Sequence, residues 1–426
     1  MIRSETDASA RIMVPSLFRN KSFTRLWVAQ ALAFTAENAN HLALIVLTEE
    51  RTHASLPVAL AILSFSLPAI LWSMPAGAIA DRQDRRRVLM ACDLLRALMA
   101  LGYLLVYLLL PGAWLLPGIL LITFLLSSIG QLAGPCEAGL IPQLVGKERL
   151  LQANSLISLT ALAAQGTGFL IVGPMLIKWV GVEGVYVANV ILYGAAAWLV
   201  STLPSGLSSP SSQSALVTHP ANLQAAIREA WQFIFSEKQI ALAMLHLTLA
   251  NAQLNMLMVI GPGLVVRGLG IGVEDAVYLA IPAGIGFASG AVLLAHYGLQ
   301  TDSVRLSRVG LLFTGLSLAG MTWVVGGPPV VQGIVISLVL SAGLGLGMAL
   351  LTVPGQTTLQ ARSAGELRGR VFSSQMLINN LVSIGPMLLA GALADLIGLQ
   401  GVLLLMVLMI ITVGLIDLRL TARPNH

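Results

Sequence analysis

Charged side chains are scarce in this sequence: only 10% of the 426 residues are Asp, Glu, Lys or Arg. A water-soluble domain carries about 25% charged and about 45–50% apolar residues, whereas the apolar share here is 56% and the mean hydropathy is +0.85. There is too little polar surface to enclose a water-soluble globule of this length. The composition therefore excludes a soluble domain, a disordered chain and a collagen-like fibre, and it predicts a polytopic membrane protein.

Cysteines and catalytic signatures are equally sparse. Cys92 and Cys136 are the two cysteines, and both lie in apolar segments without metal-ligand spacing, so no disulfide framework and no metal site is indicated. The sequence has no Walker-type loop for ATP, no nucleophile elbow and no His and Glu pair at zinc spacing. We therefore expect neither enzyme activity nor a cofactor, and any uphill transport must draw on an ion or substrate gradient.

Long apolar segments make up most of the chain. A helix needs about 20 mostly apolar residues to cross the hydrocarbon core, and twelve segments meet this length, from Thr24–Leu47 to Leu399–Leu415. The long polar interruption begins with the Ser-rich stretch SGLSSPSSQS and continues with apolar residues at every fourth position. That pattern indicates a flexible linker followed by an amphipathic surface helix. The predicted fold is an all-α membrane protein with twelve transmembrane helices in two pseudo-symmetric six-helix halves.

Charge asymmetry orients these helices. If both termini and the linker lie on one side, 20 of the 24 Lys and Arg residues lie there too, and the positive-inside rule makes that side cytoplasmic. Residues 1–23 contain no apolar segment typical of a signal peptide. We expect a bacterial cytoplasmic (inner) membrane protein with a cytoplasmic tail (1–23), a six-helix half (24–204), a cytoplasmic linker (205–238), a second half (239–418) and a second cytoplasmic tail (419–426).

The two halves echo each other in sequence. PCEAGLIPQLVGKERLLQANSL, from Pro135, and PGQTTLQARSAGELRGRVFSSQML, from Pro354, both leave the fourth span of a half at a proline and enter the fifth. Parallel six-span halves are typical of a transporter architecture with its substrate site near the midplane between the halves. Small residues in spans eight and ten predict close helix packing there, at Gly286, Gly290, Gly343, Gly345 and Gly347.

The loop between spans two and three reads GAIADRQDRRRVLM, from Gly77. Asp81 in this loop can cap the following helix or pair with an arginine, and the bland alternative is a loop that only retains positive charge on one side. The pattern Gly-x-x-x-Asp-Arg-x-x-Arg-Arg resembles the signature of the major facilitator superfamily. The resemblance implies a latch on the cytoplasmic side during alternating access, formed by Gly77, Asp81, Arg82, Arg85 and Arg86.

Other segments favour branches of that superfamily. DRQDRRRVLMACDLLRAL and LQARSAGELRGRVFSS are similar to macrolide-type efflux proteins and the enterobactin exporter. AENANHLALIVL, around Glu37, also resembles lysophospholipid transporters, with Glu37 in the place of their aspartate. The first likeness implies export of a drug or siderophore type of molecule, and the second implies a lipid flippase. Both alternatives stay open at the level of sequence.

Glu37 is the most informative single residue. It lies in the middle of the first span, with His41 one turn later on the same face. An acid in hydrocarbon is costly, so it should face an internal cavity and be protonated or paired. We therefore predict that Glu37 and His41 form a proton-coupling site, the alternative being a polar group satisfied by neighbouring helices.

Two further groups of candidates follow from polar residues inside or beside the spans. Asp93 and Arg96, at i and i+3 on one helix face, favour a gate network over substrate contact, and Gln131 and Glu137 at the end of span four can join it. The gate candidates also include Glu366, Arg368 and Arg370 in the second half. Neutral amides and a histidine that suit a polar cargo, or that hold helices together, are Asn38, Gln131, His246, Asn251, Asn255 and Asn379.

The functional expectation is a secondary active transporter that exports amphiphilic or lipophilic small molecules by proton-coupled alternating access. Its expected partners are a small-molecule or lipid-like substrate, protons and membrane lipids, with no nucleic acid, and the expected state is a monomer. The net charge of +5 is assigned to basic loops beside anionic lipid. The alternative is a lysophospholipid flippase, and a third class is a non-transporting receptor built on the same fold.

The orientation is testable by cysteine labelling. Single cysteines placed in the linker between Ser205 and Ser214 should react only after the membrane is permeabilised, because flanking positive charge retains the linker inside the cell. A cysteine placed at Arg51, in the loop on the opposite side, serves as the control and should react in intact cells. Labelling of the linker by an impermeant reagent in intact cells would overturn the orientation.

Overall fold

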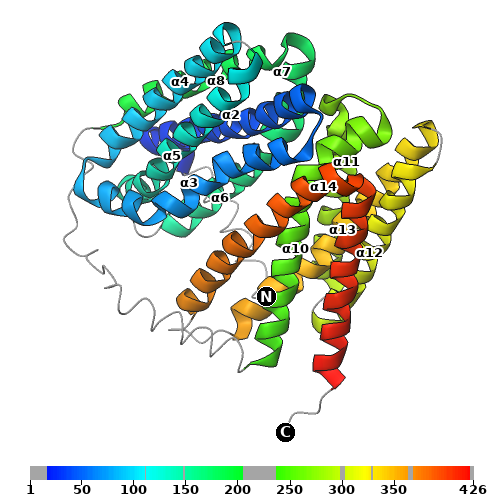
Figure 1. Cartoon of the computed structure of the whole chain (residues 1–426). Coiled ribbons are helices and arrows are strands. Elements are labelled where there is room, and N and C mark those ends of the chain that lie inside the picture. Colours follow the sequence, from blue (N-terminus) through cyan, green and yellow to red (C-terminus); the bar gives the residue numbers. More distant parts are fainter. Residues whose placement is uncertain are drawn as a thin grey trace. The chain divides into compact units, whose positions relative to one another are not determined.

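The computed structural model describes residues 17–110, 112–146, 149–204, 237–297, 303–327, 330–362 and 368–422. In these residues the backbone is helical almost throughout (Figure 1). The elements, in chain order, are α2 (Lys21–Thr52), α3 (Ser55–Arg82), α4 (Arg85–Leu109), α5 (Gly112–Val145), α6 (Leu150–Thr167), η2 (Gly168–Val172), α7 (Gly173–Val180), α8 (Val182–Ser201), α10 (Lys238–Gly263), η3 (Leu264–Gly268), η4 (Val273–Ala276), α11 (Val277–Tyr297), α12 (Ser303–Gly326), α13 (Val330–Arg362) and α14 (Arg368–Ala422).

The helical segments correspond to the twelve predicted spans when two features are recognised. α6, η2 and α7 form one interrupted segment, and α14 contains two spans that meet at Gly398, whose φ of 78° and ψ of 166° only glycine adopts readily. Within the described residues, nine helices are long and apolar enough to cross a membrane. α14 counts once among them, and neither α2 nor the interrupted α6–α7 segment is included. The AENANH stretch places polar groups in the middle of α2.

The chain divides into two compact units. The first contains Met1–Leu47 and Ala61–Leu216, and the second contains Thr48–Leu60 and Val217–His426. The second unit therefore includes a hairpin made of the last turn of α2, the α2–α3 connection and the first turns of α3. The predicted linker and its amphipathic helix lie almost entirely outside the described residues.

In the first unit, α4 packs against α5 and α8. Its core contains Leu89 and Cys92 of α4 together with Ala133, Cys136 and Leu140 of α5. Close approach of two backbones brings η2 to α2: a side chain at Gly168 would collide with the Thr35 carbonyl and with Asn38. The π-helical turn lies just before Pro174, which cannot donate a backbone hydrogen bond, and such turns accommodate that loss.

In the second unit, α13 packs against α11 and α12, and α10 packs against α14. The predicted close packing through glycine is confirmed here. A Cβ at Gly286 of α11 would lie on the Ala342 carbonyl, and a Cβ at Gly345 of α13 would lie on the Ala283 carbonyl. Each helix thus supplies a glycine where the other presents backbone, as small residues do in membrane helix pairs.

This packing predicts a sharp difference between two neighbouring glycines of α11. Gly286→Ala should destabilise the protein by about 1–3 kcal/mol, since the methyl group overpacks against backbone that has no room to move. Gly284→Ala is the matched control, because a Cβ there meets nothing within 4 Å. Thermal unfolding of the two purified variants in detergent tests this, and equal melting temperatures would contradict the packing.

Candidate functional site

A buried arginine organises the polar interior of the first unit. The Arg96 side chain on α4 is 5% exposed, and its Nη2 lies 3.6 Å from Oε2 of Glu37 on α2. Its Nη1 lies 3.9 Å from Oδ1 of Asp93, one turn earlier on α4. The guanidinium carbon also lies 5.6 Å from the ring centre of Tyr193 on α8, in cation–π range. Three helices therefore converge on one guanidinium.

A glycine on α5 makes room for this guanidinium. A Cβ at Gly130 would overlap Nη2 of Arg96. Glu137 lies two turns further along the same face of α5 and is only 7% exposed. It is close enough to Asp93 and Arg96 to interact electrostatically with both. We call Glu37, Asp93, Arg96 and Glu137 the Arg96 cluster; it contains three carboxyl groups and one guanidinium.

The members of the cluster differ in solvent access. The side chain of Glu37 is 24% exposed, whereas that of Asp93 is 1% exposed. Both oxygens of Asp93 and Oε1 of Glu137 have no hydrogen-bond partner among the described residues. Buried polar groups in proteins are normally hydrogen-bonded, and charge in an apolar interior is costly unless it is paired. The Arg96 cluster is therefore a candidate functional site.

His41, the predicted partner of Glu37, lies close enough to Glu37 and Arg96 to interact electrostatically with both. The imidazole of His41 stacks on the ring of Phe65 from α3, with centroids 4.0 Å apart and planes 20° apart. Its Nε2 is buried without a hydrogen-bond partner among the described residues. Glu37 pairs with Arg96 instead, so the sequence missed the main contact of its best candidate. Asp93 and Arg96 lie next to Glu37 in the same cluster, and their role in a gate stays a prediction.

The loop motif binds the ends of neighbouring helices. Arg85 donates to the Gly139 carbonyl of α5 at 3.2 Å, and a Cβ at Gly139 would collide with the Arg85 side chain. Arg86 donates to the Val200 carbonyl at 3.4 Å and to the Ser201 carbonyl at the end of α8. Helix C-termini favour cations because their last carbonyls are unpaired.

The N-cap of α4 is Asp84, whose side chain accepts from the backbone N–H groups of Arg86 and Arg87. The capping role considered for Asp81 is therefore wrong, because Asp81 belongs to the last turn of α3. The surroundings of Gly77 and the side chains of Asp81 and Arg82 lie outside what the structure describes. Glu366 lies outside the described residues, as do the side chains of Arg368, Arg370 and Asn379 in α14.

The remaining cavity candidates are largely satisfied within their own unit. Asn38 donates to the Phe34 carbonyl at 2.8 Å, and Asn255 donates to the Asn251 carbonyl at 2.9 Å, each one turn back along its own helix. Gln131 is half-buried next to Gly130.

His246 belongs to an ion cluster of the second unit. Its residue is 2% exposed, and its Nε2 lies 4.0 Å from Oδ2 of Asp417 on α14. The same carboxylate oxygen lies 2.9 Å from Nε of Arg308 on α12. This surrounding makes His246 part of a buried helix contact rather than an isolated polar group.

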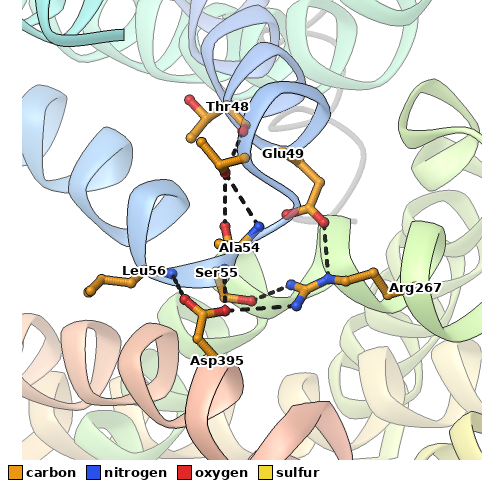
Figure 2. Close-up of polar contacts among 8 residues, drawn as sticks. Thr48, Glu49, Ala54, Ser55, Leu56, Arg267 and Asp395 are labelled. Atoms are coloured by element: carbon orange, nitrogen blue, oxygen red, sulfur yellow. Dashed lines mark hydrogen bonds and ion pairs between the residues drawn. The ribbon is translucent and has the colours of Figure 1, made fainter. Parts of the chain in front are cut away.

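A second ion network holds the hairpin Thr48–Leu60 inside the second unit (Figure 2). Nε of Arg267, in η3, lies 3.2 Å from Oε1 of Glu49, and Nη2 donates to the Ser55 hydroxyl at 2.5 Å. Nη1 of Arg267 lies 3.8 Å from Oδ1 of Asp395. We call Glu49, Ser55, Arg267 and Asp395 the Arg267 network. Burial raises the pKa of the Glu49 carboxyl, and the Arg267 guanidinium opposes that rise.

Asp395 caps a helix that is distant in the sequence. Its carboxylate accepts from the backbone N–H groups of Ser55 at 2.7 Å and Leu56 at 2.8 Å, the first residues of α3. One turn earlier on α14, a Cβ at Gly391 would collide with the Ser55 carbonyl and the Ala59 side chain. Gly391 thus allows the two backbones to approach, and Asp395 satisfies the N–H groups exposed at that point.

Nothing in the order of residues along the chain groups these four residues. Glu49 and Ser55 flank a short connection, Arg267 follows the seventh span and Asp395 follows the eleventh. One signal was present: Arg267 is one of only three Lys or Arg residues on the side predicted to be opposite the cytoplasm. A cation on the sparsely charged side needs a counter-ion, and acids stand at the ends of the first and eleventh spans.

The interrupted helices, the paired halves of the sequence and the buried charges define a membrane transporter. The family model of the Major Facilitator Superfamily matches residues 26–386, and the chain belongs to that family. It therefore has the twelve-helix fold expected from the sequence and is a transporter, not an enzyme. The uncharacterized MFS-type transporter YfiS of Bacillus subtilis (strain 168) is 26% identical over 417 residues, which cover 95% of both chains.

Solved structures share the fold. The nucleoside transporter NupG superposes with a TM-score of 0.71 at 13% identity, covering 95% of this chain and 100% of that one. A bacterial homologue of the iron transporter ferroportin, in an inward-facing state, gives a TM-score of 0.69 at 14% identity, covering 94% of this chain and 99% of that one. At these identities the likeness extends to the fold alone.

The Arg267 network predicts a measurable coupling between two residues. Asp395→Ala should lower the free energy of unfolding by about 1–2 kcal/mol, the usual cost of a lost helix cap. Arg267→Gln should cost less in the Asp395→Ala background than in the wild type, since the two side chains share partners. Arg51→Gln is the control, because Arg51 is exposed. Additive effects of Asp395→Ala and Arg267→Gln on thermal unfolding would show that the network is not a unit.

Proposed function

We propose that this protein is a proton-coupled secondary transporter that exports amphiphilic or lipophilic small molecules of the drug or siderophore type. The observation that carries the proposal is the Arg96 cluster, in which three carboxyl groups share one guanidinium inside an apolar bundle. Burying an ionisable group in an apolar bundle costs more free energy than burying an apolar side chain, so such a group points to a functional role. Proton exchange is the function that three carboxyl groups around one guanidinium support best.

The Arg96 cluster contains one carboxyl group that is open to water and two that are shielded from it. Glu37 is partly exposed, while Asp93 and Glu137 are almost fully buried. A group that takes up and releases a proton must reach water in one state and be shielded in another. Glu37 supplies the accessible end, and His41, one turn along α2, remains a candidate for the same pathway.

Conformational change requires contacts that break and re-form. The bonds from Arg85 and Arg86 to the ends of α5 and α8 serve as the cytoplasmic latch of this cycle, together with the other loop-motif residues and with Glu366, Arg368 and Arg370. The Arg267 network holds the hairpin Thr48–Leu60 on the opposite, extracellular side. In this cycle the termini and linker lie in the cytoplasm, the membrane is the bacterial inner membrane, and the transporter acts as a monomer.

A cleft in the first unit favours an amphiphilic cargo. It has a volume of about 550 Å³ and lies between α3, α4 and α5. Apolar side chains, including Val88, Leu95 and Leu132, form its wall, together with the ion pair of Asp84 and Arg87 at 3.5 Å. A molecule with an apolar body and a charged or zwitterionic head fits this lining. The same feature supports the second candidate function, lysophospholipid transport, which needs no proton.

The coupling is tested on purified protein in proteoliposomes, with an amphiphilic drug, a catechol siderophore and a lysophospholipid as cargo. Glu37→Gln should abolish uptake driven by an imposed pH gradient, since Gln keeps the shape and hydrogen bonding of Glu without titrating. Downhill exchange should survive. Glu183→Gln, an acid in the first turn of α8, is the matched control and should behave as the wild type.

Two outcomes would change the proposal. Gradient-driven uptake that persists in Glu37→Gln removes this residue from the coupling. Lysophospholipid movement that is insensitive to the pH gradient in the wild type, without uptake of the other cargoes, selects the flippase alternative.

A further inference from the structure

The Arg96 cluster contains more acid than its cation can neutralise. The titratable or charged groups that face it are Glu37 and His41 on α2, Cys92, Asp93 and Arg96 on α4, Glu137 on α5, and Tyr193 on α8. Arg96 is the only permanently charged cation among them. Three ionised carboxylates would leave a net negative charge in an apolar interior, which is strongly unfavourable. Each proton bound to a carboxyl removes one negative charge from that excess.

The contacts indicate which carboxyl holds this proton. Glu37 has the shortest ion-pair distance to Arg96, 3.6 Å, and the most solvent. Asp93 lies 3.9 Å from the same guanidinium. Glu137 forms no ion pair within 4.0 Å among the described residues, and its Oε1 is buried without a hydrogen-bond partner there. Glu137 is therefore the carboxyl with the least support for a negative charge.

A proton fits the Arg96 cluster better than a metal ion does. Among the described residues, no group of three or more His, Cys, Asp or Glu side chains is arranged to hold a metal ion. Carboxylates that bind Mg²⁺ or Ca²⁺ must converge on one point at about 2.0–2.6 Å from the ion. The cluster instead spreads its acids over three helices around an arginine, an arrangement that suits a proton.

Small residues lie on α5 between the two ends of the cluster: Gly130, the buried Ala133 and the exposed Gly134. Gly130 lies under the Arg96 guanidinium, Gly134 follows one turn later, and Glu137 follows Gly134 by three residues. A Cβ at Gly134 meets nothing within 4 Å, so open space adjoins this turn. One helical turn is a rise of about 5.4 Å, which is within the reach of a flexible arginine side chain.

We propose that Glu137 binds the transported proton and that Arg96 controls its release by moving along this face of α5. The inference rests on the proposed function and names the residue that carries its proton. When the Glu37–Arg96 pair opens, the guanidinium shifts past Gly134 to Glu137. The O–H bond of Glu137 then breaks, the proton passes to water, and the carboxylate left behind pairs with Arg96. When Arg96 returns to Glu37, the Glu137 carboxylate takes up a new proton from water on the other side of the membrane, and its O–H bond forms again.

Infrared spectroscopy of the purified full-length protein tests the site without any transport assay. The wild type at neutral pH should show the C=O band of a protonated carboxyl, and Glu137→Gln should lose it. Glu137→Asp keeps a carboxyl and should retain a shifted band, which guards against loss of folding in the Gln variant. Glu183→Gln should leave the band unchanged. Absence of the band in the wild type, or its persistence in Glu137→Gln, overturns the proposal.

A second variant tests the movement of Arg96. Gly134→Leu fills the open space on α5 without changing any charge, so it should retain the band but lose pH-driven uptake. Gly166→Leu, at another glycine whose Cβ would meet nothing within 4 Å, is the matched control. Normal pH-driven uptake by Gly134→Leu overturns the proposed shift of Arg96. Failure of the proposed function is distinguishable, because the wild type would then show the band but no response to a pH gradient.

Discussion

The interior of the first unit depends on one guanidinium that is held away from water. Arg96 cannot lose its charge in a protein, so every group around it must accommodate a fixed cation in an apolar bundle. Glu37 and Asp93 supply carboxylates, Tyr193 supplies the face of a ring, and Gly130 supplies space. These four residues come from four helices. Removing any one of them leaves a buried charge with fewer partners, which is why such a centre constrains the whole unit.

Arginine facing glycine recurs in this protein. Arg96 lies over Gly130, Arg85 lies over Gly139, and Arg267 folds back over Gly263. A guanidinium is planar and wide, so it approaches a helix backbone closely only where the helix has no side chain. In the first two cases α5 provides the glycine, which explains why that helix carries small residues along the face that also presents Glu137. The same device lets Gly391 of α14 approach the start of α3.

Much of the architecture was predictable because it rests on local properties. Hydropathy and length identified the twelve spans, since each span must be long and apolar enough to cross the bilayer and must pair its own backbone groups. The loop after Gly77 indicated the family, because its residues are contiguous. The site was predictable only in part. Glu37 stood out as an acid in an apolar span, and Arg96 and Asp93 as a helical pair, but nothing in the order of residues joined them. His41 illustrates the limit: helical spacing placed it beside Glu37, whereas its ring packs on Phe65.

The sequence by itself determined whether each segment lies in lipid or in water. It indicated which stretches are helical and apolar, how many there are, and where charged residues gather. These are properties of neighbouring residues and need no knowledge of the fold. Only the tertiary structure decided the partners of the buried charges, which lie 59 residues apart for Glu37 and Arg96 and 218 for Glu49 and Arg267. The physical reason is that a charge in an apolar interior takes its counter-ion from whichever helix packs against it, and helix packing is set by the shape of whole faces rather than by distance along the chain.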